Sequence, residues 1–292
     1  MDEILRIENL SKSFGKKKVL ENYSMCLMKG KVYGLLGKNG EGKTTLIRMI
    51  MGVIPPDSGK IFYKGKKIKF NVPLYKKEVG YIPEESIFFS WMTIDGILNF
   101  NSSFYPSWNA QKASDYLQKL SLSRKLKIKN LSRGMKLKLG LIIALASEPK
   151  LLILDDPTSG LDVPTRHDFL KDIIGEILES GTTVLFSSHL VHELEGIIDQ
   201  LGILHNGNLI LEEDFEEVKN STKRVRIIAD SLPDRIPIEG ILTKQTNGNK
   251  CELVVYPWNE EKRKELEVLS PAKIEVESLT LEEIFINFVS QD

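Results

Sequence analysis

The clearest chemical signal in the chain is a glycine-rich segment that could hold a phosphate group. Residues 37–44 read Gly-Lys-Asn-Gly-Glu-Gly-Lys-Thr, after an apolar run at 31–36 and before a helical pattern that starts at Lys43. The glycines would let backbone N–H groups curl around a phosphate, and the start of the helix would add positive partial charge. The alternative, a glycine-rich turn with a chance lysine, leaves the strand before it and the helix after it unexplained.

This segment predicts nucleotide binding. Lys43 is placed to reach the β- and γ-phosphates, and Thr44 to give a hydroxyl ligand to Mg²⁺. The cofactors expected are therefore ATP and Mg²⁺. The predicted ATP-binding residues of the segment are Gly37, Lys38, Asn39, Gly40, Glu41, Gly42, Lys43, Thr44 and Thr45.

Further polar residues occur where predicted strands end. Asp155 and Asp156 follow the apolar run 151–154, and His189 ends the strand-like run that starts at 183. A carboxylate in the place of Asp155 would lie beside a phosphate-bound Mg²⁺. Between the two groups lies the segment 130–135, Asn-Leu-Ser-Arg-Gly-Met, at the head of a predicted helix.

The order of these motifs resembles the ATP-binding subunit of ABC transporters, over essentially all of residues 1–215. Residues 131–135, here called the signature segment, are similar to a family motif that reads Leu-Ser-Gly-Gly-Gln in most members. The form Leu-Ser-Arg-Gly-Met, with Phe-Tyr-Pro-Ser-Trp before it at 104–108, resembles the ATPases of bacterial exporter-type systems. The acetoin, antibiotic and bacitracin-type subgroup is the nearest.

The resemblance implies roles for residues outside the glycine-rich segment. Phe14 would stack on adenine, although a core phenylalanine is the alternative. His189 would be a catalytic switch residue beside the γ-phosphate. In this family two subunits close head to tail over two ATP molecules. Residues that would contact the second subunit or its ATP are Ser132, Gly134 and Met135 of the signature segment, and Asp162 of a dimer loop.

Two positions depart from the family pattern. Glu84 stands where most members have glutamine; a carboxylate there still suits Mg²⁺, so the expected metal ligands are Thr44, Asp155 and Glu84. Asp156 stands in place of the glutamate that activates or holds the attacking water. Aspartate is shorter by roughly 1.5 Å, and misplacement on that scale can cost about a hundredfold in rate. Either hydrolysis is slow, or the loop around Pro157 compensates.

The elements needed to position these residues predict an α/β protein. Apolar runs feeding helices indicate a mostly parallel sheet, and a period of three and four predicts helices over 93–146. With the resemblance, the expected fold is a P-loop NTPase with a mixed sheet core, an antiparallel β subdomain and a helical signature subdomain. We expect this ATP-binding domain over 1–215, with the helical subdomain at about 90–146.

A second, smaller α+β domain is expected over 220–292, where strand-like runs alternate with charged helices. Its last helix carries an apolar stripe, Leu281, Ile284, Phe285, Phe288 and Val289. A stripe that wide must be buried, either against the small domain's own sheet, which we favour, or against a second subunit. The functional expectation is that this domain holds two subunits together when ATP is gone.

Composition limits the function classes. Lys plus Arg and Asp plus Glu are both 40, so net charge gives no attraction for nucleic acid, and no nucleic-acid partner is expected. Two distant cysteines favour a reducing compartment. No run reaches about 18 apolar residues. We therefore expect a cytoplasmic protein, and the resemblance implies that it lies peripherally on the inner face of the cell membrane.

The resemblance implies that ATP hydrolysis energises a separate membrane permease, with a second ATP-binding subunit in a homodimer or heterodimer. Two alternatives remain open. A nucleotide-dependent clamp with negligible hydrolysis is motivated by Asp156. A cytosolic ABC protein of translation or DNA repair would usually carry two cassettes or a long coiled-coil insertion, which this sequence lacks.

Overall fold

The central layer is a mixed six-stranded sheet of the kind expected. The computed structural model describes residues 2–69, 73–85, 87–170, 177, 181–229, 236, 238–268 and 273–290. The sheet has the order β10-β9-β3-β8-β7-β6, and all neighbouring strands are parallel except the β9–β10 pair. Its strands are β3 (Val32–Leu36), β6 (Val79–Ile82), β7 (Leu151–Asp155), β8 (Thr183–Ser188), β9 (Gln200–His205) and β10 (Asn208–Asp214). Every residue of β3, β7 and β8 is buried, which explains their continuous apolar character.

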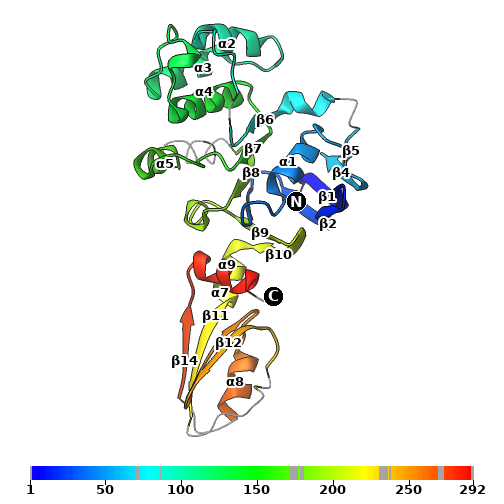
Figure 1. The fold of residues 1–292 in the computed structure, drawn as a ribbon, viewed down its shortest axis with the longest axis vertical. Helices are drawn as coiled ribbons and strands as arrows, with labels where there is room; N and C mark the ends of the chain where they lie inside the picture. Colours follow the sequence, from blue (N-terminus) through cyan, green and yellow to red (C-terminus); the bar gives the residue numbers. More distant parts are fainter. Residues whose placement is uncertain are drawn as a thin grey trace.

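An antiparallel sheet lies beside this layer, with the order β2-β1-β4-β5 (Figure 1). Its strands are β1 (Glu3–Phe14), β2 (Lys17–Met28), β4 (Ser58–Tyr63) and β5 (Lys66–Lys67). Apolar side chains of this sheet, of β3 and of α1 (Lys43–Ile50) belong to one buried cluster. The glycine-rich segment 37–42 is therefore held between two packed layers.

The helical region lies at the end of the molecule opposite the C-terminal sheet (Figure 1). It contains α2 (Ile94–Ser102), α3 (Ala110–Lys119) and α4 (Arg133–Ala146). Thr93, Asn109 and Ser132 cap these three helices through their side-chain oxygens. The leucines that recur at a spacing of three and four in this region are buried: Leu117, Leu120, Leu137, Leu141 and Leu145. The sequence pattern also predicts a helix near 164–179. The structure describes its first part as α5 (Val163–Phe169), and most of residues 170–180 lie outside the described ranges.

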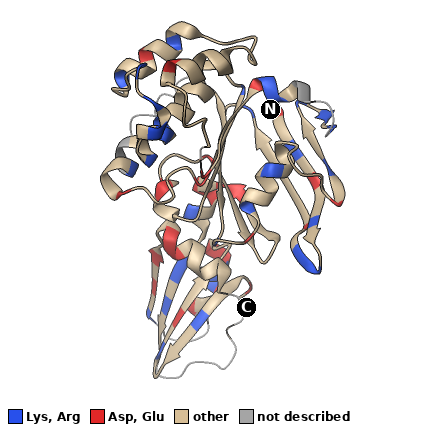
Figure 2. Cartoon of the chain, turned by 45° about the horizontal axis from the view of Figure 1, so that its top comes forward, with Lys and Arg blue, Asp and Glu red and all other residues tan. Residues whose placement is uncertain are grey.

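The C-terminal sheet has the order β12-β13-β11-β14. Its elements are α7 (Phe215–Ser221), β11 (Lys223–Ile228), β12 (Ile241–Asn247), β13 (Lys250–Val255), α8 (Glu260–Val268), β14 (Lys273–Ser278) and α9 (Leu281–Val289). Val225, Leu253 and Leu266 belong to its apolar core. Basic and acidic side chains are interspersed along its strands (Figure 2), and Arg226 lies 2.8 Å from Glu252 as an ion pair. The α/β fold class is confirmed.

The last helix packs within the chain. A capping box between Thr280 and Glu283 starts α9. Its apolar stripe joins the cluster of buried residues that includes Val191 and Leu194, in and beside the short helix η4 (Val191–Glu193), which α9 contacts. The helix also contacts β12. Expected neighbours were the small domain's own sheet or a second subunit; the structure places α9 against both β12 and η4, and η4 follows the central sheet's strand β8.

Candidate nucleotide site

The glycine-rich segment has the backbone conformation that its glycines predict. Gly40 and Gly42 have φ angles of 88° and 113°, in the region where residues other than glycine are strained. A Cβ atom on Gly42 would also lie 2.9 Å from the Val19 carbonyl oxygen. These glycines therefore serve both the tight turn and the close packing of the loop on β2.

Lys43 points back into this loop. Its ammonium group donates to the carbonyl oxygens of Gly37 at 2.6 Å and Lys38 at 3.2 Å, and the residue is 5% exposed. Burial lowers the pKa of Lys43, while the nearby carboxylates, first Asp156 and then Asp155, act in the opposite sense. The ammonium is thus fixed in the loop and faces the carboxylates.

Thr44 and Asp155 form a pair suited to a hard cation. The Thr44 hydroxyl donates to Asp155 Oδ1 at 3.2 Å, and the Ser187 hydroxyl donates to the same atom at 3.0 Å. Asp155 Oδ2 is buried and has no hydrogen-bond partner among the described residues. Burial raises the pKa of Asp155, against the effect of the Ser187 and Thr44 hydrogen bonds. A carboxylate with a free buried oxygen beside a hydroxyl fits Mg²⁺, which takes few protein ligands.

Asp156 and His189 are in direct contact. His189 Nδ1 lies 2.8 Å from both carboxylate oxygens of Asp156. The Asp156 backbone has a φ of 48° and its N–H donates to Ser187, so the residue turns sharply out of β7. Two residues that the sequence placed far apart are therefore joined by the neighbouring strands β7 and β8.

One pocket of about 450 Å³ collects most of the predicted nucleotide residues. Phe14 lies on its wall and is 52% exposed, which excludes the alternative of a core phenylalanine. Glu84 lines it too, and accepts a hydrogen bond from Ser159 at 3.1 Å. The predicted residues along its walls are Phe14, Asn39, Gly40, Gly42, Lys43, Thr44, Thr45, Glu84 and Asp156.

Other predicted residues lie away from this pocket. The Glu41 carboxylate accepts the Asn206 N–H at 2.5 Å and faces His205 at 3.1 Å, so it ties the loop to the turn after β9. The signature segment lies at the start of α4, in the helical region (Figure 1). Asp162 accepts hydrogen bonds from the N–H and hydroxyl of Thr165, near the start of α5.

Sequence reasoning missed how the signature segment contacts the loop before α5. A Cβ atom on Gly160 would lie 2.4 Å from the Arg133 guanidinium, and one on Gly134 would lie 2.9 Å from the Thr165 methyl group. The start of α4 therefore rests on the same loop that leaves β7. Sequence reasoning also missed Glu193, whose buried carboxylate contacts Thr158 after β7 and Ser188 at the end of β8. Residues 190–195 read Leu-Val-His-Glu-Leu-Glu, and this run has no spacing that marks Glu193.

Comparison with known proteins agrees with this geometry. A family model for the ABC transporter matches residues 20–159. The ABC transporter ATP-binding protein YtrB of Bacillus subtilis (strain 168) is 30% identical over 284 residues, which cover 97% of this chain and 97% of that protein. The bacitracin transport ATP-binding protein BcrA of Bacillus licheniformis is 33% identical over 226 residues, covering 77% of this chain and 74% of that protein.

A solved structure shows the same fold. An ATP-binding cassette of an ABC transporter, solved in its ADP conformation, superposes with a TM-score of 0.64 at 30% identity, over 76% of this chain and 95% of that one. None of the helices in the described ranges has the length and apolar character needed to cross a bilayer. The pocket, the motif order and the full-length relative lead to one conclusion: the chain belongs to the family of ABC transporter ATP-binding proteins.

Proposed function

We propose that this chain hydrolyses ATP with Mg²⁺ as the motor subunit of a transporter whose membrane permease is a separate protein. The observation that carries the proposal is the pocket of about 450 Å³, which brings the phosphate-binding segment, Phe14, Glu84 and Asp156 together. The aromatic ring suits adenine, the loop with its lysine suits the phosphates, and the acidic groups suit Mg²⁺.

Each group has a distinct role in the proposed reaction. Lys43 binds the phosphates, and Thr44, Asp155 and Glu84 hold Mg²⁺, which neutralises phosphate charge when bound. Asp156 orients the attacking water and accepts its proton as the water oxygen bonds to the γ-phosphorus. The bond from that phosphorus to the β,γ-bridging oxygen breaks, and ADP keeps the electron pair.

Asp156 also favours a second candidate, a nucleotide clamp that hydrolyses ATP very slowly. Both of its carboxylate oxygens lie 2.8 Å from His189 Nδ1, so the histidine competes with water for them. A single-turnover assay with excess protein separates the two functions. Release of phosphate within seconds to minutes supports the motor, whereas bound ATP that stays intact supports the clamp.

The signature segment supports a head-to-tail pair. Ser132 caps α4, with its hydroxyl 3.2 Å from the Met135 N–H, at a helix start suited to an anion. In one chain this helix start does not line the nucleotide pocket. We therefore assign Ser132, Gly134 and Met135 to contacts with the γ-phosphate of the ATP that a second subunit binds. We assign Asp162 to a loop at the contact between the two subunits.

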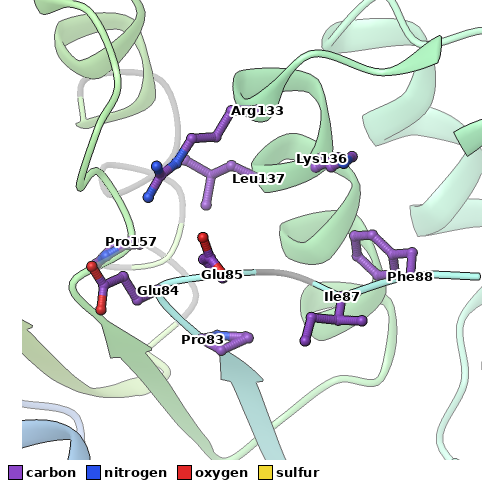
Figure 3. A pocket seen from close by; sticks show the side chains of 9 residues that line it. All are labelled: Pro83, Glu84, Glu85, Ile87, Phe88, Arg133, Lys136, Leu137 and Pro157. Atoms are coloured by element: carbon purple, nitrogen blue, oxygen red, sulfur yellow. The ribbon is translucent and has the colours of Figure 1, made fainter. Parts of the chain in front are cut away.

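A second pocket supports a permease contact. It has a volume of about 400 Å³ and lies between the segment after β6 and the start of α4 (Figure 3). Glu84 and Arg133 line one part of it, and Ile87 and Phe88 line another. Ile87 is 91% exposed. We assign this pocket to a short segment of the permease, because its walls reach both Glu84 of the nucleotide pocket and the signature helix.

An aromatic patch adjoins the pocket in sequence and extends the contact surface. Its members, Phe89, Trp91, Phe100 and Phe104, form successive ring contacts between 5.1 and 5.9 Å. All four side chains are substantially exposed. The bacitracin-transport relative favours a peptide antibiotic as the cargo of this proposed exporter.

The experiment measures phosphate release by the purified chain, alone and reconstituted with the membrane protein encoded beside it. We expect Mg²⁺-dependent hydrolysis that the permease changes. Undetectable ATP binding by calorimetry would refute the proposed function, and an unchanged rate with the permease would refute the coupling.

A further inference from the structure

Glu193 is a buried acidic residue at the end of η4, outside the nucleotide pocket. It is 2% exposed. Its Oε1 accepts a hydrogen bond from the Thr158 hydroxyl at 2.5 Å, and its Oε2 accepts one from the Ser188 hydroxyl at 2.7 Å. Arg166 Nε lies 3.3 Å from Oε1 as an ion pair. A carboxylate in such a place is stable only with partners of this kind.

Two partners of Glu193 lie on the segments that carry Asp156 and His189. Thr158 follows Asp156 by two residues, on the loop that leaves β7. Ser188 directly precedes His189, at the end of β8. One carboxylate therefore holds the loop that carries the aspartate to the strand end that carries the histidine.

The third contact extends the network toward the proposed dimer loop. Arg166 donates from Nη2 to the Leu161 carbonyl oxygen at 3.2 Å. Leu161 directly precedes Asp162, and the Asp162 carbonyl oxygen accepts the Arg166 N–H at 3.0 Å. Because η4 is itself packed against α9, the backbone of Glu193 is fixed independently of these contacts. The carboxylate is thus a rigid anchor with three partners.

We propose that Glu193 is a positioning residue that sets the geometry of the Asp156–His189 contact. Among the described residues, its polar contacts are Thr158, Ser188 and Arg166, none of which lines the nucleotide pocket, so it acts through Thr158 and Ser188. The inference rests on the proposed hydrolysis of ATP. Since a displacement of about 1 Å can cost on the order of a hundredfold in rate, loss of this anchor should appear in turnover rather than in nucleotide binding.

The principal variant is Glu193→Gln, which keeps the volume and removes the formal charge. We expect kcat to fall about 10- to 100-fold, with KM for ATP changed less than about twofold because Lys43 and its loop are untouched. The conservative second variant is Thr158→Val, which replaces the hydroxyl that donates a hydrogen bond to Glu193 Oε1. The kcat of Thr158→Val should also fall. The kcat of the double variant should be little lower than that of Glu193→Gln alone.

A matched control separates positioning from general stability. Leu253→Ala shortens a fully buried side chain of the C-terminal sheet. It should lower the melting temperature at least as much as Glu193→Gln does. Its kcat should stay within about twofold of the parent. Equal losses of kcat in Leu253→Ala and Glu193→Gln would overturn the inference, as would full activity of Glu193→Gln.

A spectroscopic readout tests the inference without hydrolysis. The chain has four histidines, so ¹⁵N-histidine labelling gives few ring signals, and His189→Gln assigns the one of interest. Glu193→Gln and Thr158→Val should shift the His189 ring signal, and Leu253→Ala should not. An unshifted signal would overturn the inference. Failure of the parent chain to hydrolyse ATP would refute the proposed function instead, and the His189 signal would still decide the role of Glu193.

Discussion

Replacing Asp156 with asparagine removes the proposed proton acceptor while it preserves the local structure. Asparagine tolerates the positive φ of 48° at this position as aspartate does. Its side-chain oxygen can keep one of the two 2.8 Å contacts with His189 Nδ1. The hydrogen bonds of Lys43 to the Gly37 and Lys38 carbonyl oxygens do not involve residue 156. We therefore expect ATP binding to survive.

The expected loss lies in the chemical step. A general base contributes about 10²- to 10⁴-fold to rate, which corresponds to about 2.7 to 5.4 kcal/mol of barrier height at 1.36 kcal/mol per tenfold. Asp156→Asn should lose about this much of kcat. Asp156→Glu keeps a carboxylate at this position and should hydrolyse ATP at the parent rate or faster. It should melt at a lower temperature, because glutamate adds a methylene at a position 5% exposed and with positive φ.

Single-turnover phosphate release, calorimetry with ATP and size exclusion together check this prediction. We expect Asp156→Asn to bind ATP with the parent affinity, to release phosphate slowly and to accumulate as a closed dimer. His189→Gln provides a comparison in which the aspartate remains. If Asp156→Asn releases phosphate as fast as the parent, the carboxylate is not the catalytic group and the assigned role is wrong.

Three further predictions follow from the same geometry. Lys43→Ala should abolish high-affinity ATP binding in calorimetry, since it removes the buried cation of the phosphate loop; retained micromolar affinity would contradict that assignment. Trp91→Ala, at a side chain 70% exposed, should lower coupled transport while basal ATPase and stability hold, the latter within about 0.5 kcal/mol; a large fall in melting temperature would show that Trp91 is structural. Burial raises the pKa of Asp155 in the folded chain, so its ionisation costs stability as pH rises from about 4, the ordinary carboxyl value, through the raised value. The melting temperature of Asp155→Asn should therefore increase relative to that of the parent as the pH rises over this range. Mg²⁺ should raise the melting temperature of the parent only. A difference in melting temperature that stays the same at all pH values would contradict this prediction.

Contiguous motifs made most of the site predictable. The conformation of residues 37–44 depends on neighbouring glycines, and the strand before it and the helix after it are adjacent in sequence, so local pattern sufficed. Asp155 was predictable because an apolar run ending in carboxylates can be read without knowing its neighbours. The helices over 93–146 carry regular leucine spacing, and their leucines are buried as expected.

The features that sequence reasoning missed depend on tertiary packing. Glu193 meets Thr158 and Ser188 because β7 and β8 are neighbours in the sheet, and no spacing in the sequence shows that. The orientation of Glu41 toward the turn at 205–206 depends on where β9 lies. The strand β12 escaped prediction because Ile241–Asn247 is largely polar and exposed, as one edge of the C-terminal sheet permits.

The packing of α9 on η4 also has a consequence for synthesis of the chain. A ribosome completes every segment of the ATP-binding region before it makes residues 281–289. During that interval Val191 and Leu194, which share a cluster with the α9 stripe, have no such cover, although the preceding sheet can already form. We expect ribosome-bound chains that lack α9 to be cut by protease near η4, and longer chains to resist it. The segment that follows His189 would then reach its final packing only after α9 has left the ribosome.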